Sequence, residues 1–96
     1  MYARVVSGPI APDKIDEAIH LWRTAVAPSA RQQSGFKSAR LLVDRKAGKV
    51  LSMGLWETEP AVQGSVDWNR EQIGRFAGLF SAPPTVEEHY EVAAEA

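Results

Sequence analysis

Two strand-like segments joined by a short polar turn lie in the middle of the chain, and they constrain its fold more than any other feature. Residues 36–44 (FKSARLLVD) and 50–57 (VLSMGLWE) are rich in apolar side chains, and residues 46–49 (KAGK) separate them. The turn is polar and offers Gly48 where a positive φ is needed, so it predicts a hairpin of two antiparallel strands.

The segment before the hairpin predicts a strand followed by a helix. Residues 2–8 (YARVVSG) form a short β-branched run that ends at Gly8-Pro9. Pro12 and Asp13 are typical of a first helical turn. An apolar stripe with a 3.6-residue spacing follows them, made of Ile15, Ala18, Ile19, Trp22, Ala25 and Val26. We expect this helix to end around Pro28 or a few residues past it.

The segment after the hairpin predicts a second helix and a fourth strand. Thr58 is the expected N-cap of the helix, and Gly64-Ser65 are expected to weaken the helix near its start. Asp67 is expected to cap a new helical segment that begins at Trp68. Its apolar stripe consists of Val66, Ile73, Phe76, Ala77 and Phe80. Pro83-Pro84 end the helix, and residues 85–93 (TVEEHYEVA) are the predicted strand.

The resulting order, β-α-β-β-α-β, predicts an α+β, ferredoxin-like fold with a four-stranded antiparallel sheet, in one domain over residues 1–96. The net charge of −1 does not indicate the basic surface that nucleic-acid binding requires. No apolar run approaches the length of a membrane span. The absence of a signal peptide favours the cytoplasm. No cysteine is present and the two histidines have no ligand-like spacing, so we expect no metal.

Strand alternation produces two sheet faces, and neither is clearly polar. We assign one face to the helices: Ala3, Val5, Ala39, Leu41, Val43, Leu51, Met53 and Leu55. The opposite face carries large apolar residues and two arginines, which predicts a homodimer with sheets packed together. Its predicted interface consists of Arg4, Phe36, Arg40, Trp56 and Tyr90, with Glu88 and Glu57 as partners for the arginines. The alternative is that both arginines extend to solvent without a partner subunit.

Three stretches of the chain are similar to the motifs of one known family: the opening MYARVVSGPIAPDKIDEAI, the central GFKSARLLVDRKAGKVLSMGLWET and the closing PPTVEEHYEV. Through them the chain resembles the antibiotic biosynthesis monooxygenase family over nearly its whole length. The resemblance implies a dimeric α/β barrel with a ligand cleft between each sheet and its own helices. It also implies, for some members, oxidation of aromatic polyketides or quinols without metal or flavin, so no cofactor is expected.

One branch of this family degrades haem, and the residues here disfavour that activity. The branch relies on an Asn in the first strand, where this chain has Ser7, and on a Trp and a His around the second helix. Trp68 is present, but residues 72–80 contain no histidine.

Five residues are candidates for the cleft: Trp22, Met53, Trp68, Asn69 and Phe76. Asn69 falls within the second apolar stripe, so it is expected either to orient a ligand or to serve the local helix start. Trp22, Met53 and Phe76 are expected to be cleft walls or plain core. Trp68 lies off the second stripe, so an exposed ring there is expected to be a lid or interface residue. Asn69 and His89 are the only candidates for catalysis, and no motif for a nucleophilic triad or a phosphate loop accompanies them.

Two functions remain open at this point. The first is a cofactor-independent monooxygenase of electron-rich aromatic or quinol substrates, in which the protein excludes water and orients the ring. The second is a non-catalytic dimeric module that binds a small apolar metabolite or has a stress-related role.

Overall fold

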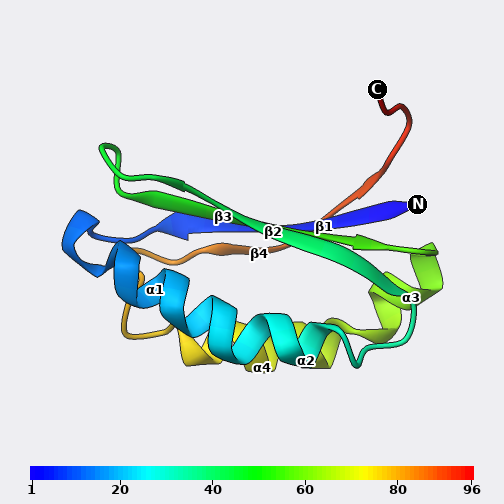
Figure 1. Ribbon diagram of the computed structural model, residues 1–96, viewed down its shortest axis with the longest axis horizontal. Helices are drawn as coiled ribbons and strands as arrows, with labels where there is room; N and C mark the ends of the chain where they lie inside the picture. The colour runs from blue at the N-terminus through cyan, green and yellow to red at the C-terminus, as the bar shows by residue number, and fades with distance from the viewer.

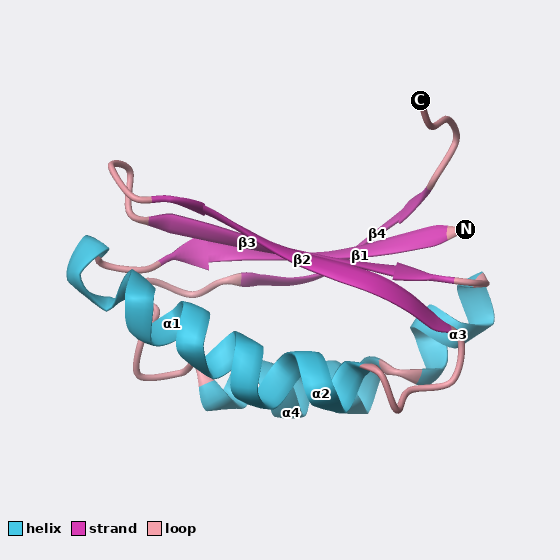
Figure 2. Cartoon of the chain, viewed as in Figure 1, coloured by secondary structure: helices cyan, strands magenta, loops and turns pink.

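The structure, a computed structural model, describes residues 1–96 and has two layers, a sheet and a layer of helices (Figure 1). The elements run in this order: β1 (Tyr2–Pro9), the 3-10 turn η1 (Pro12–Lys14), α1 (Ile15–Leu21), the π-helical turn η2 (Trp22–Val26), α2 (Ala27–Ala30), β2 (Phe36–Asp44), β3 (Lys49–Trp56), α3 (Glu59–Gly64), α4 (Val66–Arg75) and β4 (Thr85–Glu91). All helices lie on one side of the sheet (Figure 2). Not one of these helices combines the length with the hydrophobicity of a membrane-spanning helix.

The four strands are antiparallel and follow the order β2-β3-β1-β4. This arrangement confirms the ferredoxin-like α+β fold. The predicted hairpin is present between β2 and β3, where Gly48 has a φ of 69° and Asp44 Oδ1 accepts a hydrogen bond of 2.9 Å from the Ala47 amide. β2 has the predicted bounds, whereas β4 ends two residues before the predicted position.

The first helical segment is one continuous run from η1 to α2, and its middle is widened into a π turn. The amide of Ala27 donates to the carbonyl of Trp22, five residues earlier. Pro28 follows directly, has no amide hydrogen, and its ring opposes the carbonyl four residues before it. The π turn accommodates this proline inside the helix, which therefore continues to Ala30.

The second helical segment, α3 and α4, is interrupted where the sequence predicted. Thr58 caps α3 by accepting a hydrogen bond from the Ala61 amide at 3.2 Å, and α3 ends at Gly64. The next helix begins at Val66, so Asp67 lies inside its first turn and the expectation that it caps this helix is wrong. The helix also ends earlier than predicted, at Arg75, and turns lead from there to the Pro83-Pro84 pair.

The buried aliphatic core lies toward one end of the sheet. It comprises Ile10, Ile15, Ala18, Val50 and Leu79. The strand register pairs Gly8 with Val50 at this end and Tyr2 with Trp56 at the other. Between the two ends, the helices and the sheet enclose the cleft described next.

Candidate functional site

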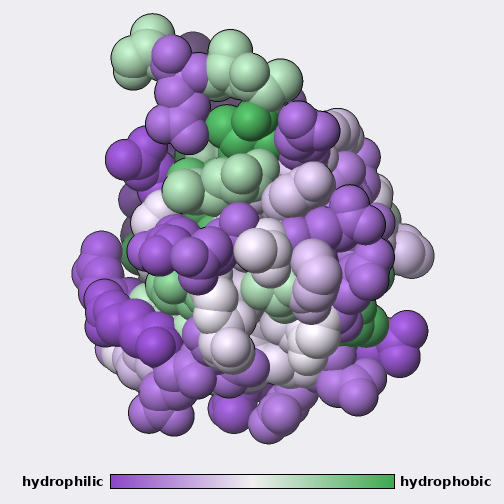
Figure 3. Space-filling view, turned by 90° about the vertical axis from the view of Figure 1, so that its right-hand side faces the viewer, coloured by the Kyte–Doolittle hydropathy of each residue, from purple (hydrophilic) through white to green (hydrophobic).

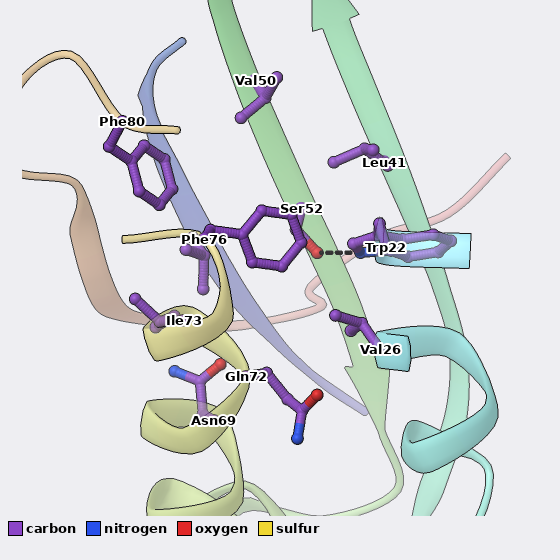
Figure 4. Close-up of a pocket in the computed structure, with 11 residues that line it drawn as sticks. Trp22, Val26, Leu41, Val50, Ser52, Asn69, Gln72, Ile73, Phe76 and Phe80 are labelled. Atoms are coloured by element: carbon purple, nitrogen blue, oxygen red, sulfur yellow. Dashed lines mark hydrogen bonds between the residues drawn. The ribbon is translucent and has the colours of Figure 1, made fainter. Parts of the chain in front are cut away.

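A cleft lies between the sheet and the helices, and its larger part is an apolar cavity of about 50 Å³. We call this part the apolar lobe. It is lined by Val6, Trp22, Val26, Leu41, Val50, Ser52, Asn69, Gln72, Ile73, Phe76 and Phe80. Figure 4 shows the rings of Trp22, Phe76 and Phe80 around the space, with the polar ends of Ser52, Asn69 and Gln72 at its edges. No side chain that ionises in the physiological range lines this lobe.

The π turn positions the indole of Trp22 over the sheet. Trp22 Nε1 donates a hydrogen bond of 3.1 Å to the Oγ of Ser52 in β3, drawn as a dashed line in Figure 4. Val26, one turn further along, lines the same wall. π turns are rare and occur often at functional sites, because they re-aim the side chains of one helical turn.

A second cavity, of about 40 Å³, adjoins the first, and we call it the polar lobe. Six residues line both lobes, so the two are parts of one cleft: Val6, Trp22, Val26, Ser52, Asn69 and Gln72. The polar lobe extends toward Arg4, Gly54 and Trp56. Two residues that line it each have a side-chain atom that is buried without a hydrogen-bond partner, Nε1 in Trp56 and Oε1 in Gln72.

Arg4 is buried at the end of the polar lobe, with only 3% of its surface exposed. Its guanidinium donates to the Oγ of Ser65 at 2.9 Å, to the carbonyl of Val62 at 2.7 Å and to Glu87 Oε2 at 3.3 Å. It also lies 5.5 Å from the ring centroid of Trp56, within range of a cation–π contact. The buried charge is therefore paired and hydrogen-bonded, as a buried arginine requires.

Glu87 connects Arg4 with both residues that the sequence proposed for catalysis. Asn69 Nδ2 donates to Glu87 Oε1 at 2.7 Å and to the carbonyl of Val86 at 2.9 Å. His89 Nε2 lies 2.6 Å from Glu87 Oε2. Asn69 thus points toward the sheet as predicted, and its side chain bonds β4 instead of the helix start. His89 is exposed and lines neither lobe.

The pKa values of Glu87 and Arg4, the two ionisable partners, are both shifted in this network. Burial raises the pKa of Glu87, but hydrogen bonds from Asn69 and His89 and the charge of Arg4 outweigh it, so the pKa lies below its usual value. Burial lowers the pKa of Arg4, and the charge and hydrogen bond of Glu87 oppose that shift. The network therefore favours an ionised Glu87.

The structure brings four of the five predicted cleft residues together. Trp22, Asn69 and Phe76 line the apolar lobe, and Trp68 lines the polar lobe, where its Nε1 donates to Ser29 Oγ. The assignment of Met53 to the cleft is wrong. Its neighbour Ser52 faces the helices, and successive residues of a strand point to opposite faces.

The predicted faces of β1 and β3 are also reversed. Arg4 and Trp56, expected at a dimer interface, are buried beneath the helices, and Trp56 has only 1% of its surface exposed. Consequently Val5, Leu51 and Leu55 occupy the face without helices, together with Met53. The error arose because the helix-facing set contains Arg4 and Ser52, polar residues whose hydrogen bonds are satisfied internally.

In β2 the predicted face is correct from Ala39 onward, since Leu41 and Val43 pack against the core beneath the helices. Phe36 is an exception to the alternation, because a bulge between Phe36 and Ser38 shifts the register. Its ring therefore packs edge-on against Trp56, with centroids 5.4 Å apart, on the helix side. The expectation that Phe36 belongs to a dimer interface is wrong for that reason.

Two of the five predicted interface residues, Arg40 and Tyr90, do lie on the open side of the sheet and are exposed. The expected ion-pair partners are wrong. Arg4 pairs with Glu87 instead. The Oε2 of Glu57 lies 3.9 Å from the Nζ of Lys37. Glu88 accepts a hydrogen bond of 3.0 Å from the Tyr90 hydroxyl.

Sequence reasoning missed Gln72 and Glu87. Gln72 follows Asn69 by three residues, so the same helical stripe that singled out Asn69 was sufficient to place Gln72 beside it. Glu87 could be found only by knowing which face of β4 meets the helices. Charged and apolar residues alternate too weakly along this strand to identify that face. The structure contains no cluster of three or more His, Cys, Asp or Glu side chains suited to a metal ion.

Comparison with known proteins gives a family and a set of structural neighbours. Residues 1–68 match the family model described as antibiotic biosynthesis monooxygenase. Two uncharacterized proteins of Mycobacterium tuberculosis are similar in sequence: Rv2557 is 35% identical over 98% of this chain, and Rv2558 is 32% identical over 92%. The matches cover 42% and 37% of those proteins, so the chain spans less than half of their length.

Solved structures share the fold at low sequence identity. A monooxygenase from the gene ActVA-Orf6 of Streptomyces coelicolor, solved in complex with nanaomycin D, superposes with a TM-score of 0.81 at 21% identity, covering 99% of this chain and 89% of that one. Rv0793 from Mycobacterium tuberculosis superposes with a TM-score of 0.73 at 18% identity, covering 99% and 97%.

Proposed function

The chain belongs to the antibiotic biosynthesis monooxygenase family, and on that premise we propose that its cleft binds a small electron-rich aromatic molecule and promotes its oxygenation by O₂. The observation that carries the proposal is the composition of the apolar lobe. Three aromatic rings and several aliphatic side chains surround it, and a few uncharged polar groups stand at its edge. Such a composition is typical of sites for small organic ligands.

The proposed reaction needs no acid, base or cofactor from the protein. An anthrone, in which a CH₂ carbon lies between two electron-rich rings, supplies the electrons itself, so O₂ adds one oxygen to that carbon, which becomes a carbonyl. The other oxygen leaves as water with the two hydrogens of that carbon. The protein's part is to exclude water and to hold the ring in one orientation, which an apolar lobe edged by Ser52, Asn69 and Gln72 supports.

The cleft must widen to admit such a substrate. A cavity of about 50 Å³ holds a few water-sized groups, whereas sites for small organic ligands are several times larger. We infer that the helices move away from the sheet on binding. The π turn around Trp22 and the turns after α4 are the segments best suited to that movement, because neither is held by a regular α-helical hydrogen-bond ladder.

Oxygen uptake with a panel of anthrones and hydroquinones tests the proposal. We expect saturable uptake by the wild-type protein. The variant Ile73→Phe, which places a ring in the apolar lobe, should abolish it, and the matched variant Arg75→Phe, exposed on the same helix, should retain it. Circular dichroism establishes that both variants are folded. Uptake that is unchanged in a folded Ile73→Phe variant would place the reaction elsewhere.

A non-catalytic binding module is the second candidate function, and one observation favours it. The apolar lobe has no acid or base on its walls, and the Glu87–His89 pair lies outside both lobes. Calorimetric binding of the same compounds without oxygen uptake would select this function over the first.

We further propose that the open face of the sheet pairs with a second copy of the chain. Leu42 and Tyr90 are 51% and 53% exposed there, and half-buried aliphatic side chains lie between them. In Figure 3 the largest group of hydrophobic atoms in view lies in the upper half, on the sheet side, and hydrophilic atoms surround the helices below. An apolar sheet face of this kind is costly to leave in water.

A further inference from the structure

A groove of about 530 Å³ lies on the outside of the molecule, between the first helical segment and the edge strand β2. We call it the edge groove. Trp22, Ala27 and Arg31 line it from the helical side, and residues 36–39 of β2 line it from the other. Trp22, Phe36 and Ala39 also line the polar lobe. The edge groove and the inner cleft therefore share a wall.

Two departures from regular secondary structure flank the edge groove. The π turn η2 lies on the helical side and carries Trp22. On the strand side, a bulge between Phe36 and Ser38 shifts the register of β2. The small side chains of Ala27 and Ala39 leave room between these two segments. π turns and β-bulges both occur often beside functional sites, because they re-aim the side chains of one element.

Trp22 lies between the edge groove and the cleft. It lines the groove and both lobes, and it is half-buried. Its one side-chain hydrogen bond is the 3.1 Å contact with Ser52, so a shift of this ring would join the groove to the lobes. The groove beside α3, which contains Glu59 and Glu91, shares no residue with either lobe. The edge groove is therefore the better route from solvent to the cleft.

The edge groove is positively charged. Arg31 and Lys37 are exposed on its walls, and none of its lining residues is acidic. Arg31 forms no ion pair. Lys37 Nζ lies 3.9 Å from Glu57 Oε2, and such an exposed pair is weak. Because the whole chain has a net charge of −1, the positive groove is a local feature and does not follow from overall composition.

We propose that the edge groove holds an anionic group of the ligand, such as a carboxylate, while the ring of the ligand occupies the inner cleft. This inference rests on the proposed function, which places the ring. It describes an elongated ligand, with an uncharged aromatic end and a negatively charged end joined by a short chain. Arg31 and Lys37 attract the anion by charge. Basic residues on an edge strand also deter pairing with other chains, and the experiment separates the two roles.

Three compounds with the same ring and chain test the charge preference: 4-(1-naphthyl)butanoate, its N-methylamide and 4-(1-naphthyl)butylamine. They carry a negative charge, no charge and a positive charge. In calorimetric titration at low salt, the wild-type protein should bind the acid about fivefold more tightly than the amide, and the amine more weakly than either. A rise in ionic strength from about 20 mM to about 200 mM should reduce the preference, because salt screens exposed charges.

Substitutions in the groove test whether its two cations cause the preference. The double variant Arg31→Gln, Lys37→Gln should bind the acid and the amide equally, and its affinity for the amide should stay within about twofold of the wild type. Arg23→Gln is the matched control. It removes a positive charge from an exposed position of the same helical segment outside the groove, and it should keep the fivefold preference.

The variant Ile73→Phe separates this inference from the proposed function, because it fills the apolar lobe and should weaken the binding of all three compounds alike. If it does so while the wild type binds acid and amide equally, the cleft stands and the anionic subsite is overturned. Arg31 and Lys37 then only protect the edge strand. A preference that Arg23→Gln loses as fully as the double variant would be a general charge effect and would also overturn the subsite. Binding that Ile73→Phe leaves unchanged, or no binding at all, would refute the cleft and this inference with it.

Discussion

Trp22 Nε1 donates a hydrogen bond of 3.1 Å to the Oγ of Ser52, and this contact joins the π turn of the first helix to the central strand β3. The two residues are thirty positions apart in the sequence. Together they form one wall of the apolar lobe, and Trp22 lines the polar lobe as well. The contact therefore determines how closely the helix approaches the sheet over the cleft.

Replacement of Ser52 by alanine should lower the free energy of unfolding by about 1 kcal/mol, because the Trp22 N–H loses its acceptor in a partly buried position. Urea denaturation measures the change, and near-ultraviolet circular dichroism should show a less ordered indole. Ser38→Ala, at an exposed position of β2, is the control and should change stability by less than about 0.5 kcal/mol. Equal effects of the two variants would show that the Trp22 contact contributes nothing.

Replacement of Glu87 by glutamine should destabilise the protein by about 2 kcal/mol at pH 7, because buried Arg4 loses its charged partner. Urea denaturation again provides the measurement. Glu71→Gln removes an exposed carboxylate that lies 3.8 Å from Arg75, and it should have little effect. A Glu87→Gln variant as stable as the wild type would show that Ser65 and Val62 suffice to hold Arg4.

The lowered pKa of Glu87 predicts how the stability of the protein depends on pH. The pKa of Glu87 is lower in the folded protein than its usual value of 4.5, so the unfolded chain binds the proton more tightly. The contribution of Glu87 is therefore complete above pH of about 4.5 and is lost as the pH falls through the lowered pKa. The difference in stability between the wild type and Glu87→Gln should narrow across that range. A difference that stays constant down to pH 3 would contradict the shift.

A methyl group added at two glycine positions, Gly8 and Gly74, should change the stability of the protein in opposite directions. A Cβ at Gly8 would lie 2.8 Å from Phe80 Cε1 and 2.9 Å from Pro84 Cβ, so Gly8→Ala should destabilise the protein by about 2 kcal/mol. Gly74 lies in α4 with no atom within 4 Å of the same position, so Gly74→Ala should stabilise by about 0.5 kcal/mol. Thermal unfolding compares them. A neutral Gly8→Ala would mean that Phe80 moves aside freely.

A charge on the open face should break the proposed dimer. Leu51→Lys places an ammonium group among the aliphatic side chains of that face, where a second sheet would have to bury it. Sedimentation velocity should show a dimer for the wild type and a monomer for the variant. Ala77→Lys adds the same charge at an exposed position after α4 and should remain dimeric. A folded wild-type monomer at micromolar concentration would refute the dimer.

The sequence predicted the elements well because their signals are local. The hairpin depends on the polar turn around Gly48, the cap of α3 on Thr58, and the break before α4 on Gly64-Ser65, and each acts within a few residues. The position of Asn69 toward the sheet followed from helical periodicity in the same way. The reversed faces of β1 and β3 had a different cause. Both faces of those strands hold apolar residues, so alternation alone did not show which face the helices cover.

Residues close together along the chain were enough to specify the order of the elements, the antiparallel hairpin and the stripe that carries Asn69. Three features depended on the folded arrangement: Arg4 is buried beside Glu87, Met53 faces away from the cleft, and Gln72 and Trp56 each keep one buried side-chain atom without a hydrogen-bond partner. Each of these depends on residues that meet across the sheet and helices. A buried polar side chain is stable only when its distant partners are in place, and no local pattern specifies those partners.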